Sequence, residues 1–340
     1  MSLVPPVLAG ERLALARLLT QVENNTPAGR AALVELFPHT GRAHLVGVTG
    51  APGTGKSSLV NQLVRYYRHP ADGGPPRQVA IVAFDPSSPF TGGAILGDRV
   101  RMRDLSGDPG VFIRSMAARG SLGGLAPATA AVAQVFDAAG FDLVLIETVG
   151  AGQAEVDVAR LAHTTVVVEA PGLGDDIQAI KAGILEIADI LVVNKADRPG
   201  VENAERALRG MLQLASPGPP LAHHHGWLET LAVEVPREAP TPAWEPPILR
   251  TVATEGAWVA ELAKAIDRHR AYLESSGDWQ RRDRARLRVE LESLLRARLV
   301  ARWRENVPAD RYQAVLDRLA ARQISPHQAV EALLDGDQLP

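Results

Sequence analysis

A glycine-rich stretch that could bind phosphate lies between an apolar run at 44–49 and a helical pattern that begins near residue 56. Residues 50–57 read GAPGTGKS and match the phosphate-loop pattern G-x-x-x-x-G-K-S/T. In this pattern backbone N–H groups cradle the phosphates, Lys56 reaches the terminal phosphates and the Ser57 hydroxyl binds Mg²⁺. The strand–loop–helix context that the pattern requires is present, so the stretch predicts a nucleoside triphosphate site. The predicted binding residues are Gly50, Ala51, Pro52, Gly53, Thr54, Gly55, Lys56, Ser57 and Ser58.

A second motif would select the base. Residues 194–197 read NKAD, directly after the apolar run 189–193, and resemble the guanine-specificity pattern N-K-x-D. Asp197 would accept hydrogen bonds from the guanine N1–H and exocyclic amine. Lys195, which follows Asn194 in the chain, would lie along the guanine ring. Adenine lacks these donors and would leave the carboxylate unpaired. A simple turn after a strand is the alternative, but the position downstream of a phosphate loop favours GTP and GDP as ligands.

Three carboxylates stand at or just after the ends of predicted strands. Asp85 closes the run 79–85, Asp98 lies in the glycine-rich loop that follows, and Glu147 closes the run 143–147. An acid at the end of a buried strand needs a partner, and Mg²⁺ prefers oxygen ligands together with several waters. The alternative for the two aspartates is a turn or a helix cap. The predicted Mg²⁺ ligands are Ser57, Asp85, Asp98 and Glu147, and the predicted catalytic residues are Lys56, Asp85, Asp98 and Glu147.

The segment after the last of these strands could sense hydrolysis. Gly150 supplies a turn whose backbone N–H could contact a γ-phosphate. Most GTPases place Asp where Glu147 stands, so the longer side chain favours a water-mediated role at the metal. Gln153 could orient the attacking water or simply begin a helix, and the lack of a clear water-positioning residue predicts slow intrinsic hydrolysis. Two roles stay open for Arg99, Arg101 and Arg103: they could stabilise the charge that develops on the phosphate during hydrolysis, or they could form ion pairs on the surface.

The elements that must position these groups follow a repeating pattern. From 44 to 252, short runs that are apolar at every position alternate with amphipathic stretches of helix length. Such runs fit strands covered on both faces, and their spacers imply a parallel sheet with crossover helices. We therefore expect an α/β P-loop NTPase fold with a mostly parallel sheet flanked by helices. The expected divisions are an N-terminal helical segment at 1–42, a GTPase domain at 43–255 and a C-terminal helical dimerisation region at 256–340.

The composition limits the classes of function. With 340 residues, of which 46% are hydrophobic, the chain can bury a sizeable core. The formal net charge of −3 gives no general attraction to nucleic acid or to an anionic membrane, so neither is expected as a partner. The absence of cysteine excludes disulfides, Cys-ligated zinc and iron–sulfur clusters. The apolar runs are shorter than a membrane span of about 20 residues and no leader pattern is present, so we expect a cytoplasmic protein.

A charged helix predicted over 279–304 carries both a basic run and a leucine stripe. Five arginines between 281 and 288 resemble a nucleic-acid patch, but leucines recur at i, i+4, i+7, i+8 and i+12 on the same helix. An amphipathic helix that packs against a partner is the better interpretation, and we assign it to dimerisation. The stripe consists of Leu287, Leu291, Leu294, Leu295 and Leu299.

Five blocks, taken in order, resemble a known family of GTPases. The blocks are GAPGTGKSS, FDPSSPFTGGAILGDRVRM, ETVGAGQAE, APGLGDDIQAIKAGILEIAD and NKAD. They are similar to the GTPases that chaperone adenosylcobalamin-dependent acyl-CoA mutases, the MeaB-like or methylmalonic-aciduria type A group. The resemblance runs from about residue 8 to 335, and the second block is specific to that group.

The resemblance implies a cytoplasmic homodimer that hydrolyses GTP slowly and binds a cobalamin-dependent acyl-CoA mutase, such as methylmalonyl-CoA mutase. It implies that the protein gates adenosylcobalamin loading and helps to replace damaged cofactor, with a cobalamin adenosyltransferase as a further partner. Asp85, Asp98 and Glu147 would organise Mg²⁺ and its waters. The switches would be 85–102, 147–155 and 171–181, the third reporting to the mutase through Gln178 and Lys181. A backbone N–H of Val252, Ala253 or Thr254 would face the guanine O6.

Two other functions remain open from the sequence. A nickel-inserting GTPase would need metal ligands, and His223, His224 and His225 lie in the proline-rich stretch 215–247. Consecutive histidines do not converge on one tetrahedral ion, so a solvated loop is favoured. A small-molecule kinase or transport ATPase would bind ATP, which the N-K-x-D pattern opposes.

Overall fold

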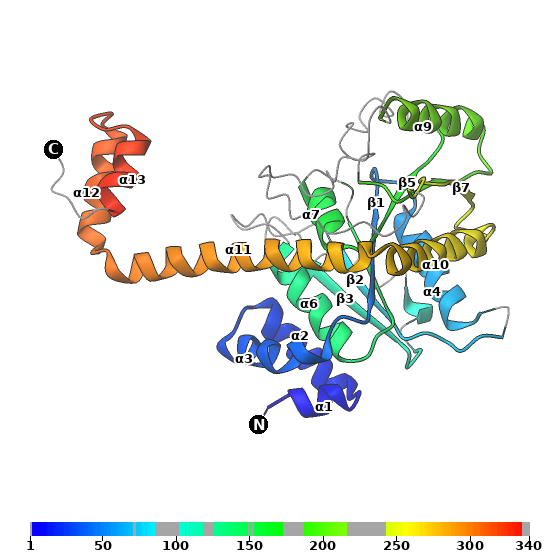
Figure 1. Cartoon of the computed structure of the whole chain (residues 1–340), viewed down its shortest axis with the longest axis horizontal. Helices are drawn as coiled ribbons and strands as arrows, with labels where there is room; N and C mark the ends of the chain where they lie inside the picture. The colour runs from blue at the N-terminus through cyan, green and yellow to red at the C-terminus, as the bar shows by residue number, and fades with distance from the viewer. Residues whose placement is uncertain are drawn as a thin grey trace. The chain divides into compact units, whose positions relative to one another are not determined.

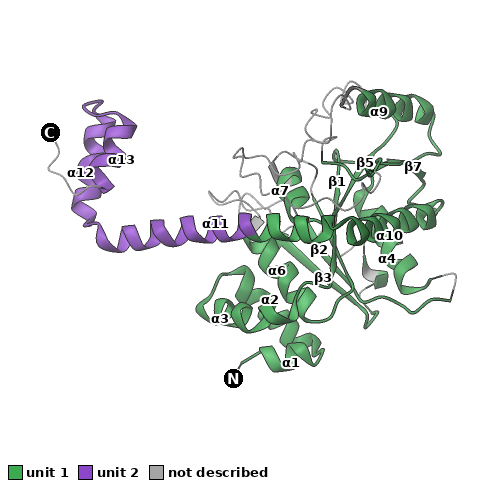
Figure 2. Ribbon diagram, viewed as in Figure 1, with its two compact units in different colours: residues 1–287 green, residues 288–340 purple. Residues whose placement is uncertain are grey.

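The computed structural model divides the chain into two compact units, residues 1–287 and residues 288–340 (Figure 2). The first unit contains the sheet and all the nucleotide motifs, and the second unit is helical where it is described. The residues that the structure describes are 2–70, 73–85, 102–105, 107–117, 126–148, 150, 153–172, 187–215 and 243–334.

Seven strands form a sheet in the first unit. They are β1 (His44–Thr49), β2 (Val79–Asp85), β3 (Val111–Ala117), β4 (Leu143–Glu147), β5 (Thr164–Glu169), β6 (Ile190–Asn194) and β7 (Ile248–Thr251). Their order is β3-β2-β4-β1-β5-β6-β7, and every neighbouring pair is parallel, which confirms the predicted fold class. Because the strands are parallel, their carboxyl ends meet at one edge of the sheet, where ligands bind in open α/β folds.

Helices cover both faces of this sheet. They are α4 (Lys56–Arg68), α6 (Ala126–Ala138), α7 (Gln153–Leu161), α9 (Val201–Ala215) and α10 (Val259–Ser276). Successive strand residues point to opposite faces, so Val46 and Val48 share a core with α4 and α10, whereas Leu45 shares one with α6 and α7. The helix α9 packs on β5 and β6 through a third cluster. The central strands are therefore buried on both faces, which explains why their middle positions are apolar.

Three α-helices precede the sheet, one more than the two short helices that helically spaced apolar residues over 8–36 predict. They are α1 (Val4–Leu8), α2 (Arg12–Glu23) and α3 (Pro27–Leu36). The additional helix α1 is a short turn that starts with prolines, which the first turn of a helix accepts. The start of α3 is capped because the Thr26 hydroxyl accepts a hydrogen bond from the backbone N–H of Gly29 at 3.0 Å. The helices α2 and α3 pack beside α6 (Figure 1), so they share a core with one face of the sheet.

The remaining helices are α11 (Asp278–Asn306), α12 (Ala309–Ala320) and α13 (Pro326–Leu334). Gly277 separates α10 from α11 in the left-handed conformation, at a φ of 76°, as expected for the end of a helix. The helix α10 packs against α4 within the first unit, although the predicted dimerisation region 256–340 includes it. Among the described residues, no helix combines the length and hydropathy that crossing a bilayer requires.

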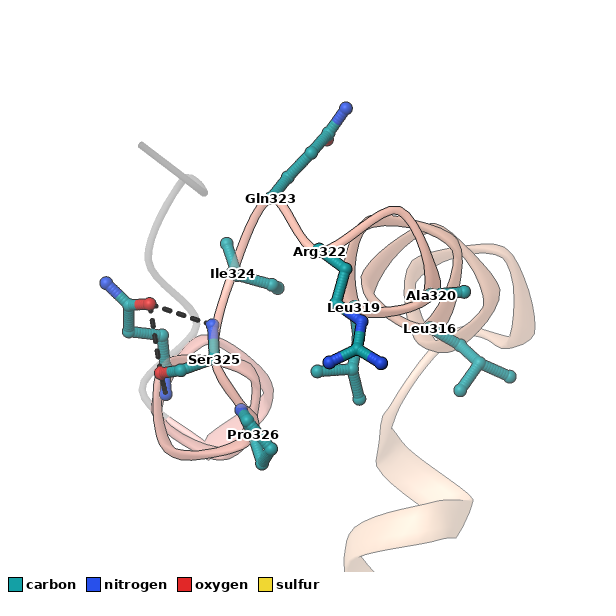
Figure 3. A pocket seen from close by; sticks show the side chains of 9 residues that line it. Leu316, Leu319, Ala320, Arg322, Gln323, Ile324, Ser325 and Pro326 are labelled. Atoms are coloured by element: carbon teal, nitrogen blue, oxygen red, sulfur yellow. Dashed lines mark hydrogen bonds between the residues drawn. The ribbon is translucent and has the colours of Figure 1, made fainter.

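The second unit holds a small core between α12 and α13, formed by Val315, Ile324 and Ala329. A hollow of about 750 Å³ opens beside the turn that joins these helices (Figure 3). Its polar groups cap α13: the side chain of Gln328 accepts from the Ser325 backbone N–H at 2.9 Å and shares a 3.0 Å hydrogen bond with the Ser325 hydroxyl. This hollow is therefore part of a helix start and contains none of the predicted nucleotide residues.

Candidate nucleotide-binding site

The phosphate loop joins β1, in the middle of the sheet, to the start of α4. Gly50 and Gly55 have φ angles of 134° and 94°, which favour glycine. A Cβ atom at Gly50 would lie 2.0 Å from the carbonyl oxygen of Val168, and one at Gly55 would lie 2.4 Å from the amide nitrogen of Asn194. The glycines of the motif are thus required both by the backbone turn and by the close approach of β5 and β6.

The Lys56 amine lies inside the phosphate loop. Its Nζ donates hydrogen bonds to the carbonyl oxygens of Gly50 at 2.7 Å and Ala51 at 3.0 Å, and the residue is buried. A Cβ atom at Gly150 would lie 2.6 Å from this amine and 2.4 Å from the Gly50 carbonyl oxygen. The structure therefore brings Lys56 and Gly150 together, as the sequence predicts for groups that share the terminal phosphates.

Ser57 and Glu147 meet directly beside this loop. The Ser57 hydroxyl, in the first turn of α4, donates to Oε1 of Glu147, the last residue of β4, at 2.5 Å. Ala83 is the register partner of Glu147 on β2, so Asp85 follows two residues further toward the same edge of the sheet. The side chain of Asp85 lies outside the described residues. Two of the four predicted metal ligands are thus in contact, and both offer oxygen, as Mg²⁺ requires.

Asn194 connects the phosphate loop to the segments predicted to bind the base. Its amide nitrogen donates to the carbonyl oxygen of Thr54 at 2.8 Å. Its amide oxygen accepts from the Thr251 hydroxyl and from the Ala253 backbone N–H, both at 3.0 Å. Lys195 follows at a φ of 57° and donates from Nζ to the carbonyl oxygen of Gly53 at 2.6 Å. One side chain on β6 thus fixes both the phosphate loop and the segment 251–253, which are separated from Asn194 and from each other by long stretches of sequence.

The base-recognition residues surround this junction. Asp197 is exposed, in a turn held by the hydrogen bond from the Ala196 N–H to the Thr251 carbonyl oxygen at 3.0 Å. Val252 and Ala253 are buried and Thr254 is exposed. The carboxylate that would select guanine is therefore presented to solvent beside the predicted O6 contact.

Three threonines in the site were not identified from the motifs. Thr251 ends β7 and binds Asn194, while the hydroxyls of Thr49 and Thr148 lie 3.0 Å apart behind the phosphate loop. Each residue ends a strand or directly follows one, on the same edge of the sheet as the motifs. A polar residue at the carboxyl end of a predicted strand is therefore a sequence signal that could have identified these threonines as part of the site.

Several predicted residues lie outside the described part of the chain. For Arg103 and Gln153 only the backbone is described; Gln153 begins α7. The switch segments 85–102 and 171–181 fall largely within undescribed stretches. The other residues outside the description are Asp98, Arg99, Arg101, Gln178, Lys181, His223, His224 and His225.

Comparisons with known proteins agree with this geometry. The family described as "Methylmalonyl Co-A mutase-associated GTPase MeaB" matches residues 15–308. A putative GTPase of Pyrococcus abyssi is 41% identical over 332 residues, which cover 98% of this chain and 95% of that protein. The methylmalonic aciduria type A homolog of Caenorhabditis elegans is 31% identical over 290 residues, 81% of this chain and 67% of that protein. A crystal structure described as LAO/AO transport system kinase matches with a TM-score of 0.66 and 26% identity, covering 98% and 96% of the two chains. These matches confirm the resemblance found in the sequence: the chain belongs to the MeaB family of methylmalonyl-CoA mutase-associated GTPases.

Proposed function

We propose that this protein binds and slowly hydrolyses GTP, and that it gates adenosylcobalamin loading into a cobalamin-dependent acyl-CoA mutase and protects or reactivates that enzyme. Methylmalonyl-CoA mutase is the first candidate, because the family is named for its association with that enzyme. The observation that carries the guanine-nucleotide part is the Asn194 amide, which links the phosphate loop to both base-recognition segments.

The phosphate-binding role rests on groups that are already oriented. The loop from Gly50 to Ser58 would present its N–H groups to the phosphates, at the amino end of α4. Lys56 would exchange the carbonyl oxygens of Gly50 and Ala51 for oxygens of the terminal phosphates. The exchange replaces neutral acceptors with charged ones, so the amine gains stronger hydrogen bonds when nucleotide binds.

The contact between Ser57 and Glu147 fits a Mg²⁺ site, because a hydroxyl and a carboxylate oxygen lie together beside the phosphate loop. Asp85 and Asp98 would complete the site, largely through waters. When bound, Mg²⁺ would neutralise charge that develops on the β- and γ-phosphate oxygens. Gly150, which lies against Gly50 and Lys56, would offer its N–H to the γ-phosphate and so distinguish GTP from GDP.

The nucleotide state would then be passed to the partner. We assign this role to the segment 171–181, with Gln178 and Lys181 as contacts to the mutase, and we expect a cobalamin adenosyltransferase as a further partner. The protein would act in the cytoplasm as a homodimer. The exposed leucine stripe on α11 supports that assembly.

The decisive test is a titration of GTP hydrolysis with purified methylmalonyl-CoA mutase. We expect a saturable change in the hydrolysis rate, and we expect GTP and GDP to change the rate at which adenosylcobalamin enters the apo-mutase. A cobalamin-independent enzyme at the same concentrations is the control. A hydrolysis rate that stays constant up to high mutase concentrations would contradict the chaperone role.

Base selection is tested separately with Asp197→Asn, which replaces an acceptor by a donor that faces the guanine N1–H and amine. We expect the preference for GTP over ATP to fall about 10- to 1000-fold. Asp197 is exposed, so the melting temperature should not change. An unchanged preference for GTP would contradict the role of Asp197, whereas competition of ATP with GTP in the wild type would support an ATP-dependent activity.

A further inference from the structure

We propose that Thr49 and Thr148 form a positioning pair that fixes the start of the second switch against the phosphate loop and thereby sets the preference for GTP over GDP. This inference rests on the proposed function, because it concerns how Gly150 meets the γ-phosphate. Neither threonine is among the residues predicted to bind phosphate, metal or base, although Thr148 lies within the second switch.

The two side chains join the ends of neighbouring strands. Thr49 is the last residue of β1, directly before Gly50, and Thr148 directly follows Glu147 at the end of β4. Their hydroxyls lie 3.0 Å apart, and the residues are 0% and 1% exposed. The Thr148 N–H also donates to the Val48 carbonyl oxygen at 3.1 Å, which extends the β1–β4 ladder one residue beyond Glu147. The chain is therefore held by two hydrogen bonds at Thr148.

This anchor lies very close to the groups that it would position. Only one residue separates Thr148 from Gly150, so their Cα atoms are at most about 7 Å apart. Gly150 has a φ of 84°, and a Cβ atom there would lie 2.4 Å from the Gly50 carbonyl oxygen and 2.9 Å from the Pro52 nitrogen. The second switch thus leaves the sheet at the hydroxyl pair and immediately contacts the phosphate loop. A shift of Thr148 would move the Gly150 N–H directly.

Because both threonines are buried, their hydroxyls depend on each other for a hydrogen bond. A hydroxyl that is removed from water needs a partner, and each threonine supplies one for the other. Valine keeps the branched shape but has no hydroxyl. A single Thr→Val substitution would leave the other hydroxyl buried without this partner, whereas the double substitution would remove both polar groups and restore a consistent apolar contact. Stability and positioning can therefore be separated experimentally.

The test measures the affinities for GDP and for a non-hydrolysable GTP analogue in Thr49→Val, Thr148→Val and the double variant. Each single variant should lower the melting temperature by about 3–6 °C, and the double variant should recover most of that loss. The ratio of GDP to analogue dissociation constants should fall about three- to tenfold in the double variant, because only the analogue uses the Gly150 N–H. Thr148→Ser, which keeps the hydroxyl, should retain the wild-type ratio.

Thr129→Val is the matched control, since Thr129 is 2% exposed but lies on α6. It should leave the ratio unchanged even if the melting temperature falls. A wild-type ratio in the double valine variant would overturn the inference, and so would an equal fall of the ratio in Thr129→Val. If the wild-type chain binds no guanine nucleotide, the proposed function itself fails, which is a separate result.

A measurement on the wild-type chain needs no substitution. Amide hydrogen exchange should show Thr148 protected with both GDP and the GTP analogue, whereas protection of Gly150 should rise only with the analogue. If the Thr148 amide exchanged as fast as Gly150 in the GDP state, the hydroxyl pair would not be a fixed point and the inference would be wrong.

Discussion

Asn194 is a buried amide whose hydrogen bonds all go to segments that the motifs place around the nucleotide. It is 2% exposed, donates to Thr54 and accepts from Thr251 and Ala253. A buried donor or acceptor that loses its partner costs about 1–3 kcal/mol. Asn194 thus fixes the phosphate loop relative to the base-recognition segment. Its removal should therefore lower nucleotide affinity more than the loss of a single direct contact with the nucleotide would.

Asn194→Ala should lower the affinity for both GTP and GDP about 10- to 100-fold, because the Thr54 carbonyl, the Thr251 hydroxyl and the Ala253 N–H lose a shared partner. Titration calorimetry measures this loss. Asn203→Ala is the control, since Asn203 is exposed on α9 and its side chain accepts a hydrogen bond from Arg206. An affinity within twofold of the wild type would show that the junction is not needed for binding.

At the scale of elements, the joint between the N-terminal helices and β1 depends on one helix residue. Asp137 on α6 accepts hydrogen bonds from the backbone N–H groups of Gly41, Arg42 and Ala43 at 2.6, 3.1 and 2.9 Å. These residues form the turn that leads into β1, and the carboxylate is buried. The start of the central strand is therefore fixed from the neighbouring helix.

Asp137→Ala should lower the free energy of unfolding by about 2–4 kcal/mol, since three N–H groups lose an ionised acceptor. Urea denaturation at neutral pH measures this change. Asp142→Ala is a matched control, because Asp142 is exposed and its carboxylate accepts a hydrogen bond from the Gln78 N–H; its loss should be below about 1.5 kcal/mol. Equal losses in the two variants would contradict the role of the triple contact.

A second joint, at the amino ends of the strands, contains buried histidines. His44 Nε2 lies 2.7 Å from the hydroxyl of Thr164, which lies 2.8 Å from Nδ1 of His269 on α10. His163 accepts from the Leu45 N–H at Nδ1 and therefore donates from Nε2 to Asp283 of α11, at 3.1 Å. These contacts hold α10 and the first turns of α11 on the sheet.

The surroundings of the histidines oppose their protonation. Burial, followed by the charges of His163, Arg270, His269 and Arg77, holds the pKa of His44 well below its usual 6.5. Burial also lowers the pKa of His163, although its hydrogen bond to Asp283 acts in the opposite direction, and Arg286 and Arg282 lower it further. The folded chain thus keeps both rings neutral at pH values where the unfolded chain binds protons.

Stability should therefore be full above about pH 6.5 and should fall as the pH drops from there toward the lowered pKa values of the folded state. Asp189 adds a separate effect. Burial alone would raise the pKa of its carboxyl, but Arg282 and His269 favour the charged form and lower this pKa, so further stability is lost as the pH falls below the usual 3.8. Urea unfolding at pH 7.5 and 5.5 measures the histidine part. His44→Gln should flatten the dependence and exposed His39→Gln should not. Equal stability at both pH values in the wild type would refute this assignment.

The sequence predicts the elements better than the joints between them. The central strands are evident in the sequence because parallel strands buried on both faces are apolar through their middle positions. The breaks that Gly277 and Pro326 predict between helical stretches are also confirmed, because glycine and proline mark helix boundaries through backbone geometry alone. The pairing of Thr49 with Thr148 and the acceptor role of Asp137 join residues that are 94 to 99 positions apart, and the strand order makes neighbours of strands that are not consecutive in the chain. Periodicity describes one segment at a time, so it carries no information about such pairs.

At the scale of the whole molecule, most leucines of the α11 stripe lie in the second unit and are exposed there. In the second unit, Leu291, Leu294, Leu295 and Leu299 are 66%, 57%, 54% and 57% exposed. The core of this unit is small, so exposed apolar area on this scale indicates an interaction surface. The spacing of these leucines places them on one side of the helix, as a helix that pairs with a partner requires.

Replacing Leu291 and Leu295 together by glutamine should separate the expected homodimer without unfolding the chain. Both side chains are exposed in the single chain, so the substitution costs the monomer little, whereas each leucine buried between two copies contributes about 1.5–3 kcal/mol. The dimer dissociation constant should rise at least about 100-fold, as measured by sedimentation equilibrium. Val34→Gln is the control, because Val34 is 75% exposed on α3 and lies outside the stripe. A double variant that still sediments as a dimer at the concentrations where the wild type does would place the interface elsewhere on the molecule.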